Sequence, residues 1–134
     1  MFILEKNIPT PNDYMDIRAS AGMTQRSLDG VKKGLGNEIF SVIIKNEFTG
    51  EVVGMGRIIG DGGTVFQICD MAVKNEWQGK GGGTLIMNSL MDYISENVQE
   101  KAYINLLADI KGFYEKWGFK PTSPNSIGMY IRKI

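Results

Sequence analysis

Residues 78–84 of the chain read Gln-Gly-Lys-Gly-Gly-Gly-Thr. This glycine-rich run lies between a strand-like stretch, residues 64–73, and a stretch with helical periodicity, residues 84–98. Glycines can turn successive backbone N–H groups toward one side, and the start of the following helix adds unpaired N–H donors and a partial positive charge. Taken alone, such a run is more often only a flexible loop. Its position before a helix predicts instead an anion-binding loop whose ligand is a phosphate group.

Two common phosphate-binding motifs do not fit this run. A P-loop would need Gly-x-x-x-x-Gly-Lys-Ser/Thr, which occurs nowhere in the chain. A dinucleotide fingerprint that begins at Gly79 would need Gly or Ala at position 84, where the chain has Thr84. The run does fit a third pattern, Gln-x-x-Gly-x-Gly, at Gln78, Gly81 and Gly83.

A second motif lies further along the chain. Residues 112–119 read Gly-Phe-Tyr-Glu-Lys-Trp-Gly-Phe. Together with residues 71–84, this segment resembles the GNAT superfamily of acyl-CoA-dependent N-acetyltransferases, whose pyrophosphate loop precedes a Phe-Tyr-Glu-Lys-x-Gly-Phe segment. The resemblance covers nearly the whole chain. It implies one α/β domain over residues 1–134 with the GNAT fold, in which a mixed, mostly antiparallel central sheet is flanked by helices.

The pattern of apolar and turn residues predicts the element order β-α-α-β-β-β-α-β-α-β, which is also the order that the resemblance implies. The expected strands cover residues 2–8, 40–45, 51–59, 64–73, 102–108 and 127–131. The expected helices run from a cap at Asn12 or Asp13 toward Gly22, from a cap at Ser27 toward Gly34, and over residues 84–98 and 110–117.

The composition excludes several classes of function. Lys plus Arg and Asp plus Glu each number 15, so the net charge is zero and the chain lacks the basic surface typical of nucleic-acid or acidic-membrane binding. The apolar runs are short, and we expect neither a membrane span nor a signal peptide. Cys69 is the single cysteine and the chain has no histidine, which excludes an internal disulfide, Ser-His-Asp triads and imidazole metal sites. We expect a cytoplasmic protein with small-molecule partners and no metal.

The resemblance also implies how acetyl-CoA would bind. The backbone of Met71, Ala72 and Val73 is expected to pair with the pantetheine arm of the coenzyme. The pyrophosphate is expected on the main-chain N–H groups of the following residues: Gln78, Gly79, Lys80, Gly81, Gly82, Gly83 and Thr84. The Lys80 ammonium and the Thr84 hydroxyl could add to this binding. For Lys80, a solvated surface charge is the alternative.

Acetyl transfer from a thioester to an amine needs a group that removes the amine proton and an acid that protonates the leaving thiolate. By resemblance, Tyr114 is the acid and also contacts the coenzyme. The residue types alone favour an aromatic side chain packed on the core with its hydroxyl at the rim. Two positions depart from the family pattern, because Leu107 and Ile110 stand where many members have Asn and Ala.

The base is less clearly marked. Some GNAT members have a glutamate on the central strand where this chain has Gln67, which cannot accept a proton at neutral pH. Asp70 is the nearest carboxylate, and we expect it on a shielded strand face with Phe66, Ile68 and Ala72, where burial would raise its pKa. A structural aspartate bonded to nearby backbone and a water chain to solvent are the alternatives.

The acceptor amine is expected between the N-terminal helices and the central sheet. Met23, Arg26 and Phe40 are the candidates that would line this site. Each has a structural alternative, namely core packing for Met23 and Phe40 and a surface charge for Arg26. A covalent acetyl intermediate on Cys69 is a minor alternative to direct transfer, since a lone strand cysteine is usually an inert small apolar residue.

These observations predict an acetyl-CoA-dependent N-acetyltransferase that acts on a primary amine of a small molecule by direct transfer in a ternary complex. A non-catalytic acyl-CoA sensor is one alternative, favoured by Gln67 and by Leu107 in place of asparagine. An acyltransferase acting on a protein amine is the other. A homodimer is also expected, because the last strand and the exposed sheet edges could pair across a two-fold axis.

Overall fold

Five strands form one sheet in the order β1-β2-β3-β4-β5 in the computed structural model, which describes residues 1–134. The strands are β1 (Phe2–Glu5), β2 (Phe40–Asn46), β3 (Val52–Gly60), β4 (Val65–Val73) and β5 (Tyr103–Asn105). The first four pair antiparallel, and β5 pairs parallel to β4. The expected mixed and mostly antiparallel sheet is therefore confirmed.

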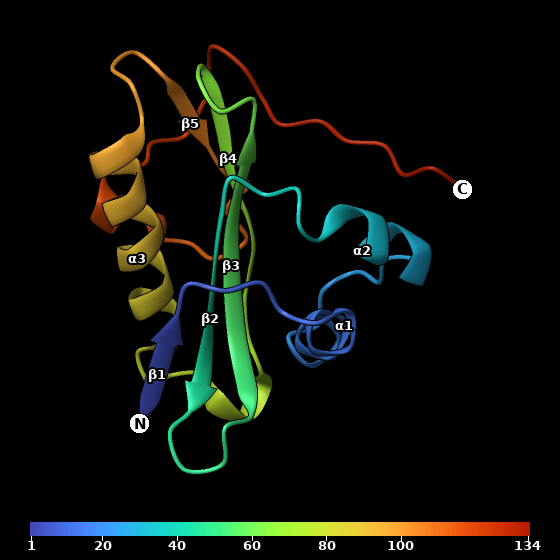
Figure 1. Ribbon diagram of the computed structural model, residues 1–134. Helices are drawn as coiled ribbons and strands as arrows, with labels where there is room; N and C mark the ends of the chain where they lie inside the picture. Colours follow the sequence, from blue (N-terminus) through green and yellow to red (C-terminus); the bar gives the residue numbers. More distant parts are fainter.

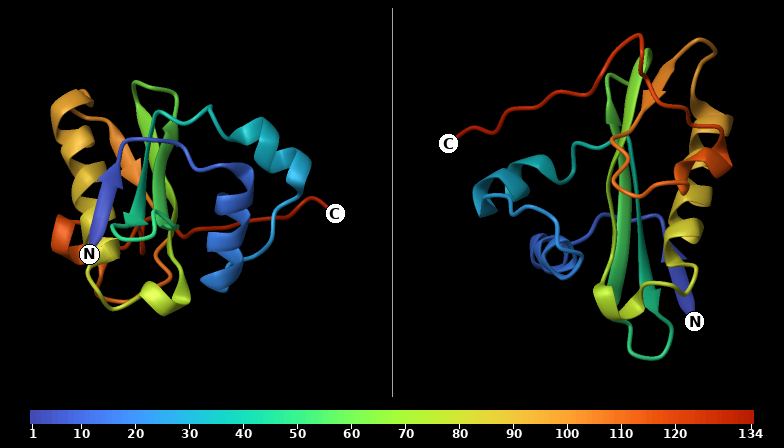
Figure 2. Two further views of the ribbon diagram at one scale, coloured as in Figure 1. Left: turned by 60° about the horizontal axis from the view of Figure 1, so that its bottom comes forward. Right: turned by 180° about the vertical axis from the view of Figure 1, so that it is seen from behind.

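Helices cover both faces of this sheet. They are α1 (Pro11–Ser20), α2 (Leu28–Gly34) and α3 (Gly82–Asn97), and two short 3-10 turns are η1 (Asn75–Trp77) and η2 (Tyr114–Trp117). Figure 1 shows α3 on one side of the sheet and α1 and α2 on the other, and Figure 2 shows the same layers from two further directions. The flanking helices complete the three-layer α/β arrangement that the sequence predicts.

The first two helices begin at side-chain caps. Ser27 caps α2 as expected, accepting a hydrogen bond from Gly30 N at 3.0 Å. The cap of α1 is Thr10, whose hydroxyl accepts from Asp13 N at 3.1 Å, rather than Asn12 or Asp13. Pro11 suits the first helical position, where its missing N–H costs nothing, so the cap falls on the residue before it.

Two apolar clusters lie on the two faces of the sheet. The larger joins α3 to the sheet through Val42, Ile44, Ile58, Phe66, Ile68, Ile86, Met87 and Leu90, among others. The smaller joins α1 and α2 to the opposite face through Tyr14, Ile17, Val31, Ile43, Met55 and Ala72. Close packing of α3 requires Gly56, because a Cβ at this position would lie 2.6 Å from Ile86 Cγ2.

A β-bulge interrupts β4 at Asp70. This residue has a φ of 55°, and the register of β3 with β4 shifts between Met55 and Arg57. Phe66 and Ile68 before the bulge pack on the α3 side, whereas Asp70 binds arginines on the α1 side. The expectation that Asp70 shares a face with Phe66 and Ile68 is wrong, because the extra residue reverses the side-chain alternation. Asp70 does share the α1 side of the sheet with Ala72, as expected.

The strands β4 and β5 diverge after a short pairing. Only residues 65–67 of β4 pair with residues 103–105 of β5. The expected strand over residues 102–108 is therefore much shorter than predicted, and residues 68–73 of β4 have no neighbouring strand on that side. The sheet opens there into a gap between two strands.

The C-terminal part of the chain differs from the sequence prediction. Residues 110–117 form only the 3-10 turn η2, and residues 127–131 form no strand. Figures 1 and 2 show the last residues leaving the sheet near β5 and crossing to the side of α1 and α2, where Arg132 Nη2 lies 3.4 Å from Thr24 Oγ1. A strand requires a paired neighbour, and in a single copy these residues have none.

Asp61 closes the turn between β3 and β4 and provides a test of acid stability. Its carboxylate accepts hydrogen bonds from Gly63 N, Thr64 N, Val65 N and the Thr64 hydroxyl, and these bonds hold its pKa well below the usual value. A lowered pKa stabilises the fold above the unfolded-state value of about 3.9, and this contribution is lost as the pH falls. We expect the urea midpoints of the wild type and Asp61→Asn to differ at pH 6 and to approach each other progressively as the pH falls from 4 toward the lowered pKa of Asp61. A gap of constant size down to pH 2.5 would contradict this.

Candidate functional site

The glycine-rich loop ends in a helix start that no side chain caps. Gly79 and Gly81 have φ values of 75° and 86°, and a Cβ at either position would meet no atom within 4 Å. Gly81 immediately precedes α3, which has neither a side-chain cap nor an acidic residue in its first turn. By contrast, α1 and α2 each begin with a side-chain cap and carry an acidic residue in the first turn. The first N–H groups of α3 are thus available to an external anion.

The two glycines that follow hold the loop in place. Gly82 is buried, and a Cβ there would lie 2.9 Å from Ile44 Cδ1, so this end of α3 lies directly on the sheet. Gly83 lies against the ring of Phe113, at 3.4 Å from the position of a Cβ. The other loop residues predicted to bind pyrophosphate, Lys80 and Thr84 among them, are exposed. The Gln78 side chain instead donates to Val73 O at 2.9 Å.

The stretch Met71, Ala72 and Val73 lies at the open edge of β4. Ala72 and Val73 pair with β3 on one side, and β5 has already diverged on the other. An extended ligand can bind such an edge through main-chain hydrogen bonds, in the way that an added strand does. Because Gln78 binds Val73 O, this edge leads directly into the glycine-rich loop.

Tyr114 is buried beside this loop. Only 6% of the residue is exposed, and its ring packs edge-on against Phe113 with the centroids 5.1 Å apart. Since Phe113 also contacts Gly83, the aromatic pair links the start of α3 to Tyr114. Burial raises the pKa of the Tyr114 phenol, and the Asp109 carboxylate adds to the effect. Tyr114 therefore retains its proton at neutral pH and can serve as an acid.

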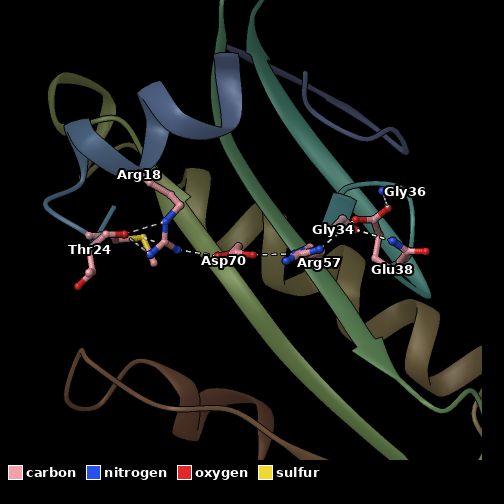
Figure 3. A network of polar contacts seen from close by, with 9 residues as sticks. Arg18, Thr24, Gly34, Gly36, Glu38, Arg57 and Asp70 are labelled. Atoms are coloured by element: carbon pink, nitrogen blue, oxygen red, sulfur yellow. Dashed lines mark hydrogen bonds and ion pairs between the residues drawn. The ribbon is translucent and has the colours of Figure 1, made fainter. Parts of the chain in front are cut away.

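A chain of ion pairs crosses the opposite face of the sheet (Figure 3). Asp70 accepts from Arg18 Nη1 at 2.6 Å through one oxygen and from Arg57 Nε at 2.7 Å through the other. Arg57 Nη1 also donates to Glu38 at 3.2 Å. The side chains of Arg18 and Asp70 are only 4% and 8% exposed. Two carboxylates thus neutralise two guanidinium groups that α1 and β3 place on either side of the bulge.

Comparisons with known proteins identify the family of this chain. Residues 36–121 match the profile of a family described as the acetyltransferase (GNAT) domain. The chain belongs to the GNAT acetyltransferase family. An uncharacterized N-acetyltransferase, ycf52, from Porphyra purpurea is 32% identical over 115 residues, which are 83% of this chain and 65% of that relative. Its counterpart from Pyropia yezoensis is 31% identical over the same coverage. The chain thus spans about two thirds of the length of these relatives.

Solved structures agree with the family assignment. A protein of unknown function from meticillin-resistant Staphylococcus aureus, described as a probable acetyltransferase, is 44% identical, with a TM-score of 0.93 over 99% of this chain and 100% of the other. A GNAT family protein from Streptococcus pneumoniae is 21% identical, with a TM-score of 0.77 over 100% and 98% of the two chains. The second likeness supports the fold alone.

Three of the network residues of this GNAT chain were not predicted as site residues. Arg18 follows buried Ile17 on α1, and Arg57 lies within an apolar strand, so each is a charge at a position where an apolar residue would be expected. A charge at an expected apolar position could have identified Arg18 and Arg57, but it gives no indication that both bind Asp70. Glu38 carries no such signal, because its place before β2 resembles an ordinary turn.

The structure separates the predicted acceptor residues. Met23 lies beside the network, with its Sδ 4.0 Å from Arg18 Nη1. Arg26 lines a cavity of about 200 Å³ together with Tyr14 and Arg57. Phe40 lies on the α3 side of the sheet and stacks on Tyr93 at 4.4 Å between centroids. Met23 and Arg26 are thus on one face of the sheet and Phe40 is on the other. Phe40 is on the α3 side because the side chains of β2 alternate between the two faces.

Gln67 and Cys69 lie on β4 before the bulge. The Gln67 amide donates to Asn105 Oδ1 at 3.1 Å and so bridges β4 to β5 just before they diverge. Burial raises the pKa of the Cys69 thiol to about 11, so the thiol is protonated and a weak nucleophile at neutral pH.

The chain shows no group of three or more His, Cys, Asp or Glu side chains that could hold a metal ion. None of its helices combines the length and the apolar character that crossing a bilayer requires.

Proposed function

We propose that residues 1–134 form one GNAT domain that transfers an acetyl group from acetyl-CoA to a primary amine of a small molecule, directly within a ternary complex. The observation that carries the proposal is the uncapped start of α3 at Gly81, which Phe113 links to the buried Tyr114. An anion-binding helix start and a protonated phenol are the two groups that a diphosphate-bearing thioester needs at its two ends. The family profile, which spans the loop and Tyr114, supports the same activity.

In this proposal the coenzyme lies along the gap between β4 and β5. Its pantetheine arm pairs with the open backbone edge at Met71, Ala72 and Val73. Its diphosphate accepts from the main-chain N–H groups of residues 79–84, with the Lys80 ammonium and the Thr84 hydroxyl as further donors. This direction places the thioester near the bulge, since Asp70 directly precedes the Met71 edge.

The reaction then forms a C–N bond and breaks a C–S bond. The neutral amine attacks the thioester carbon, the sulfur leaves with its electron pair, and the Tyr114 hydroxyl supplies the proton that this thiolate takes up. The raised pKa of Cys69 supports direct transfer rather than an acetyl-cysteine intermediate. Every proton lost by the amine must reach a base or the solvent.

Asp70 is the carboxylate nearest to the proposed thioester position, but both its oxygens already bind guanidinium groups. We therefore assign Asp70 the role of holding the bulge and α1 in position, and we assign removal of the amine proton to a water chain to solvent. If Asp70 were itself the base, it would have to give up one of these ion pairs. The Asp70→Asn experiment in the Discussion distinguishes this alternative from the structural role.

The acceptor binds on the α1 and α2 side in this proposal, with Met23 and Arg26 near its entrance. The small size of the cavity beside Arg26, about 200 Å³, favours a small-molecule amine over a protein amine. The single cysteine is consistent with a cytoplasmic location. A homodimer is part of the same proposal.

A thiol-release assay tests this function. The protein is supplied with acetyl-, propionyl- or succinyl-CoA and with a panel of small primary amines and lysine peptides, and free coenzyme A is measured. We expect amine-dependent release that is fastest with acetyl-CoA and a small amine. Coenzyme binding without release on any acceptor would indicate the non-catalytic acyl-CoA sensor, and release with peptides alone would indicate a protein acyltransferase.

Tyr114→Phe is expected to lower turnover about 100-fold, within the range typical of general acid catalysis, with little change in coenzyme affinity. The phenol pKa lies above its ordinary value of about 10, so the wild type keeps this acid over the whole practical assay range. Turnover and calorimetric affinity are compared with those of Tyr93→Phe, which removes a hydroxyl from a tyrosine on α3. Equal turnover in the wild type and Tyr114→Phe would remove Tyr114 from the acid role.

A further inference from the structure

The cavity on the α1 and α2 side of the sheet is lined by two arginines and by no acidic residue. It has a volume of about 200 Å³. Arg57 reaches it from β3, and Arg26 reaches it from the segment that leads into α2. Val31 and Leu35 supply an apolar wall. The cavity therefore combines positive charge with room for only a few atoms, which suits a small anionic group.

Arg57 is held in place and keeps one free nitrogen. Its Nε donates to Asp70 and its Nη1 donates to Glu38, whereas its Nη2 takes part in no hydrogen bond or ion pair. The guanidinium also lies over the ring of Tyr14, with Cζ 5.9 Å from the ring centroid. Figure 3 shows Gly34, another residue of the cavity wall, at this end of the ion-pair network. Arg57 thus presents a fixed and unused donor at the cavity.

The charge of Arg26 is not balanced by any carboxylate. The buried network is neutral, because the two guanidinium groups of Arg18 and Arg57 face the two carboxylates of Asp70 and Glu38. Arg26 forms no ion pair and is exposed. A lone surface arginine is usually only a solvated charge. Here it shares a cavity with the free Nη2 of Arg57, so the two groups together favour an anion.

Ser41 gives a second indication that a polar ligand belongs beside Arg57. Ser41 on β2 is the direct cross-strand partner of Arg57 on β3. Only 7% of this serine is exposed, and its hydroxyl is the one buried side-chain oxygen without a hydrogen-bond partner. Buried polar groups nearly always have a partner, and side chains paired across strands lie about 5 Å apart. An unsatisfied hydroxyl next to a free guanidinium nitrogen therefore points to a ligand with oxygen atoms.

We propose that the acceptor is a small primary amine that also carries a carboxylate or phosphate group, which Arg26 and Arg57 bind at this cavity. The proposal rests on the acetyl transfer proposed above and specifies its substrate class. Carboxylate and phosphate share the chemistry that recognises them, because the planar guanidinium donates to two oxygens of either group. The net charge at the cavity selects such acceptors over uncharged amines of the same length.

Arg57 also joins the cavity to the reaction centre. It contacts Asp70 of the bulge through Nε and faces the cavity with the same guanidinium group. Since the thioester is proposed to lie near the bulge, a short chain is enough to connect the reacting amine to the bound anionic group. The apolar wall of Val31 and Leu35 is suited to the methylene groups of that chain.

Matched pairs of amines test the substrate class in the thiol-release assay with acetyl-CoA. The pairs are β-alanine with propylamine, γ-aminobutyrate with butylamine, and phosphoethanolamine with ethanolamine. We expect kcat/KM to be about 30-fold higher for the anionic member of at least one pair, as for a hydrogen bond to a charged group. The preferred pair shows whether the group is a carboxylate or a phosphate. Equal kcat/KM within every pair would overturn the proposal and leave the acetyl transfer itself intact.

Arg26→Met tests the residue that supplies the unbalanced charge, with little risk to folding because Arg26 is exposed and has no ion-pair partner. We expect the KM of the preferred anionic amine to rise about 30-fold, while the KM of its uncharged counterpart and the affinity for coenzyme A stay unchanged. Arg26→Lys should restore part of the preference. Lys33→Met is the matched control, since Lys33 is an exposed cation of α2 that does not line the cavity. An equal rise in KM in both methionine variants would overturn the assignment.

A binding measurement separates failure of this proposal from failure of the proposed reaction. If no amine supports thiol release, the acetyl transfer is wrong, and the cavity is tested directly by saturation-transfer NMR. The full chain with coenzyme A is mixed with β-alanine, γ-aminobutyrate or phosphoethanolamine, and the wild type is compared with Arg26→Met. Binding that the variant loses would support an anion site without the reaction. No binding of any of these probes to the wild type would overturn the site.

Discussion

Replacing Gly81 with glutamate is expected to raise the dissociation constant of coenzyme A about 100-fold, which corresponds to about 2.7 kcal/mol. Two effects combine in this change. Gly81 has a φ of 86°, and holding a residue with a side chain in such a region costs on the order of 1–3 kcal/mol. A carboxylate at the start of α3 would also occupy and repel the position where the diphosphate binds. Isothermal titration calorimetry with coenzyme A measures the result.

Two matched variants separate these effects from a general loss of folding. Gly81→Gln keeps the side-chain length without the charge, and should weaken binding less than Gly81→Glu does. Gly50→Glu places the same residue at another open glycine, with a φ of 75°, in the β2–β3 turn. It should leave coenzyme affinity unchanged. Unaltered affinity in a folded Gly81→Glu protein would show that the glycine-rich loop does not hold the diphosphate.

The loop and the aromatic segment could be predicted because their chemistry is local. Gly79 and Gly81 have positive φ and Gly83 lies close to Phe113, so glycines at these positions already indicate a backbone that residues with a Cβ rarely adopt. Their spacing before a periodic helix placed them at the start of α3. The pairing of β2, β3 and β4 followed for the same reason, since each turn between them has a strong local signal, such as Asp61 in the β3–β4 turn.

The ion-pair network could not be predicted because it depends on one backbone irregularity. Arg18 and Asp70 are separated by 52 positions in the sequence, and they meet only because the bulge turns Asp70 toward α1. Strict alternation along β4 would have placed this carboxylate in the apolar cluster under α3. Phe40 illustrates the same dependence on register, since its place on β2 decides which face of the sheet it occupies.

The C-terminal segment shows a different limit. Residues 127–131 have the composition of a strand, because isoleucine and tyrosine favour extended backbone locally. A strand nevertheless forms only against a neighbour, and the turn over residues 122–126 directs this segment away from β5 in a single copy. Composition can therefore identify the preference for a strand, but not whether a neighbouring strand is there to pair with it.

Asp70→Asn is expected to lower the free energy of unfolding by about 3 kcal/mol, because removing one member of a buried ion pair leaves uncompensated charge behind. Here the loss affects two guanidinium groups, those of Arg18 and Arg57, with the Glu38 carboxylate as the remaining partner of Arg57. Urea unfolding followed by circular dichroism measures the change. Glu51→Gln is the matched control, since Glu51 pairs with Lys74 at the surface and its loss should have little effect.

The double variant Asp70→Asn/Arg18→Met tests the cause of this destabilisation. If uncompensated charge is responsible, removing the Arg18 guanidinium should restore part of the lost stability, because an apolar side chain can replace a buried ion. A stability of Asp70→Asn equal to that of the wild type would contradict the structural role. If such a stable variant also lost turnover while it retained coenzyme affinity, Asp70 would instead be the base that accepts the amine proton. If Asp70→Asn is less stable but its folded fraction still turns over substrate, Asp70 holds the bulge in place. The amine proton then leaves through water.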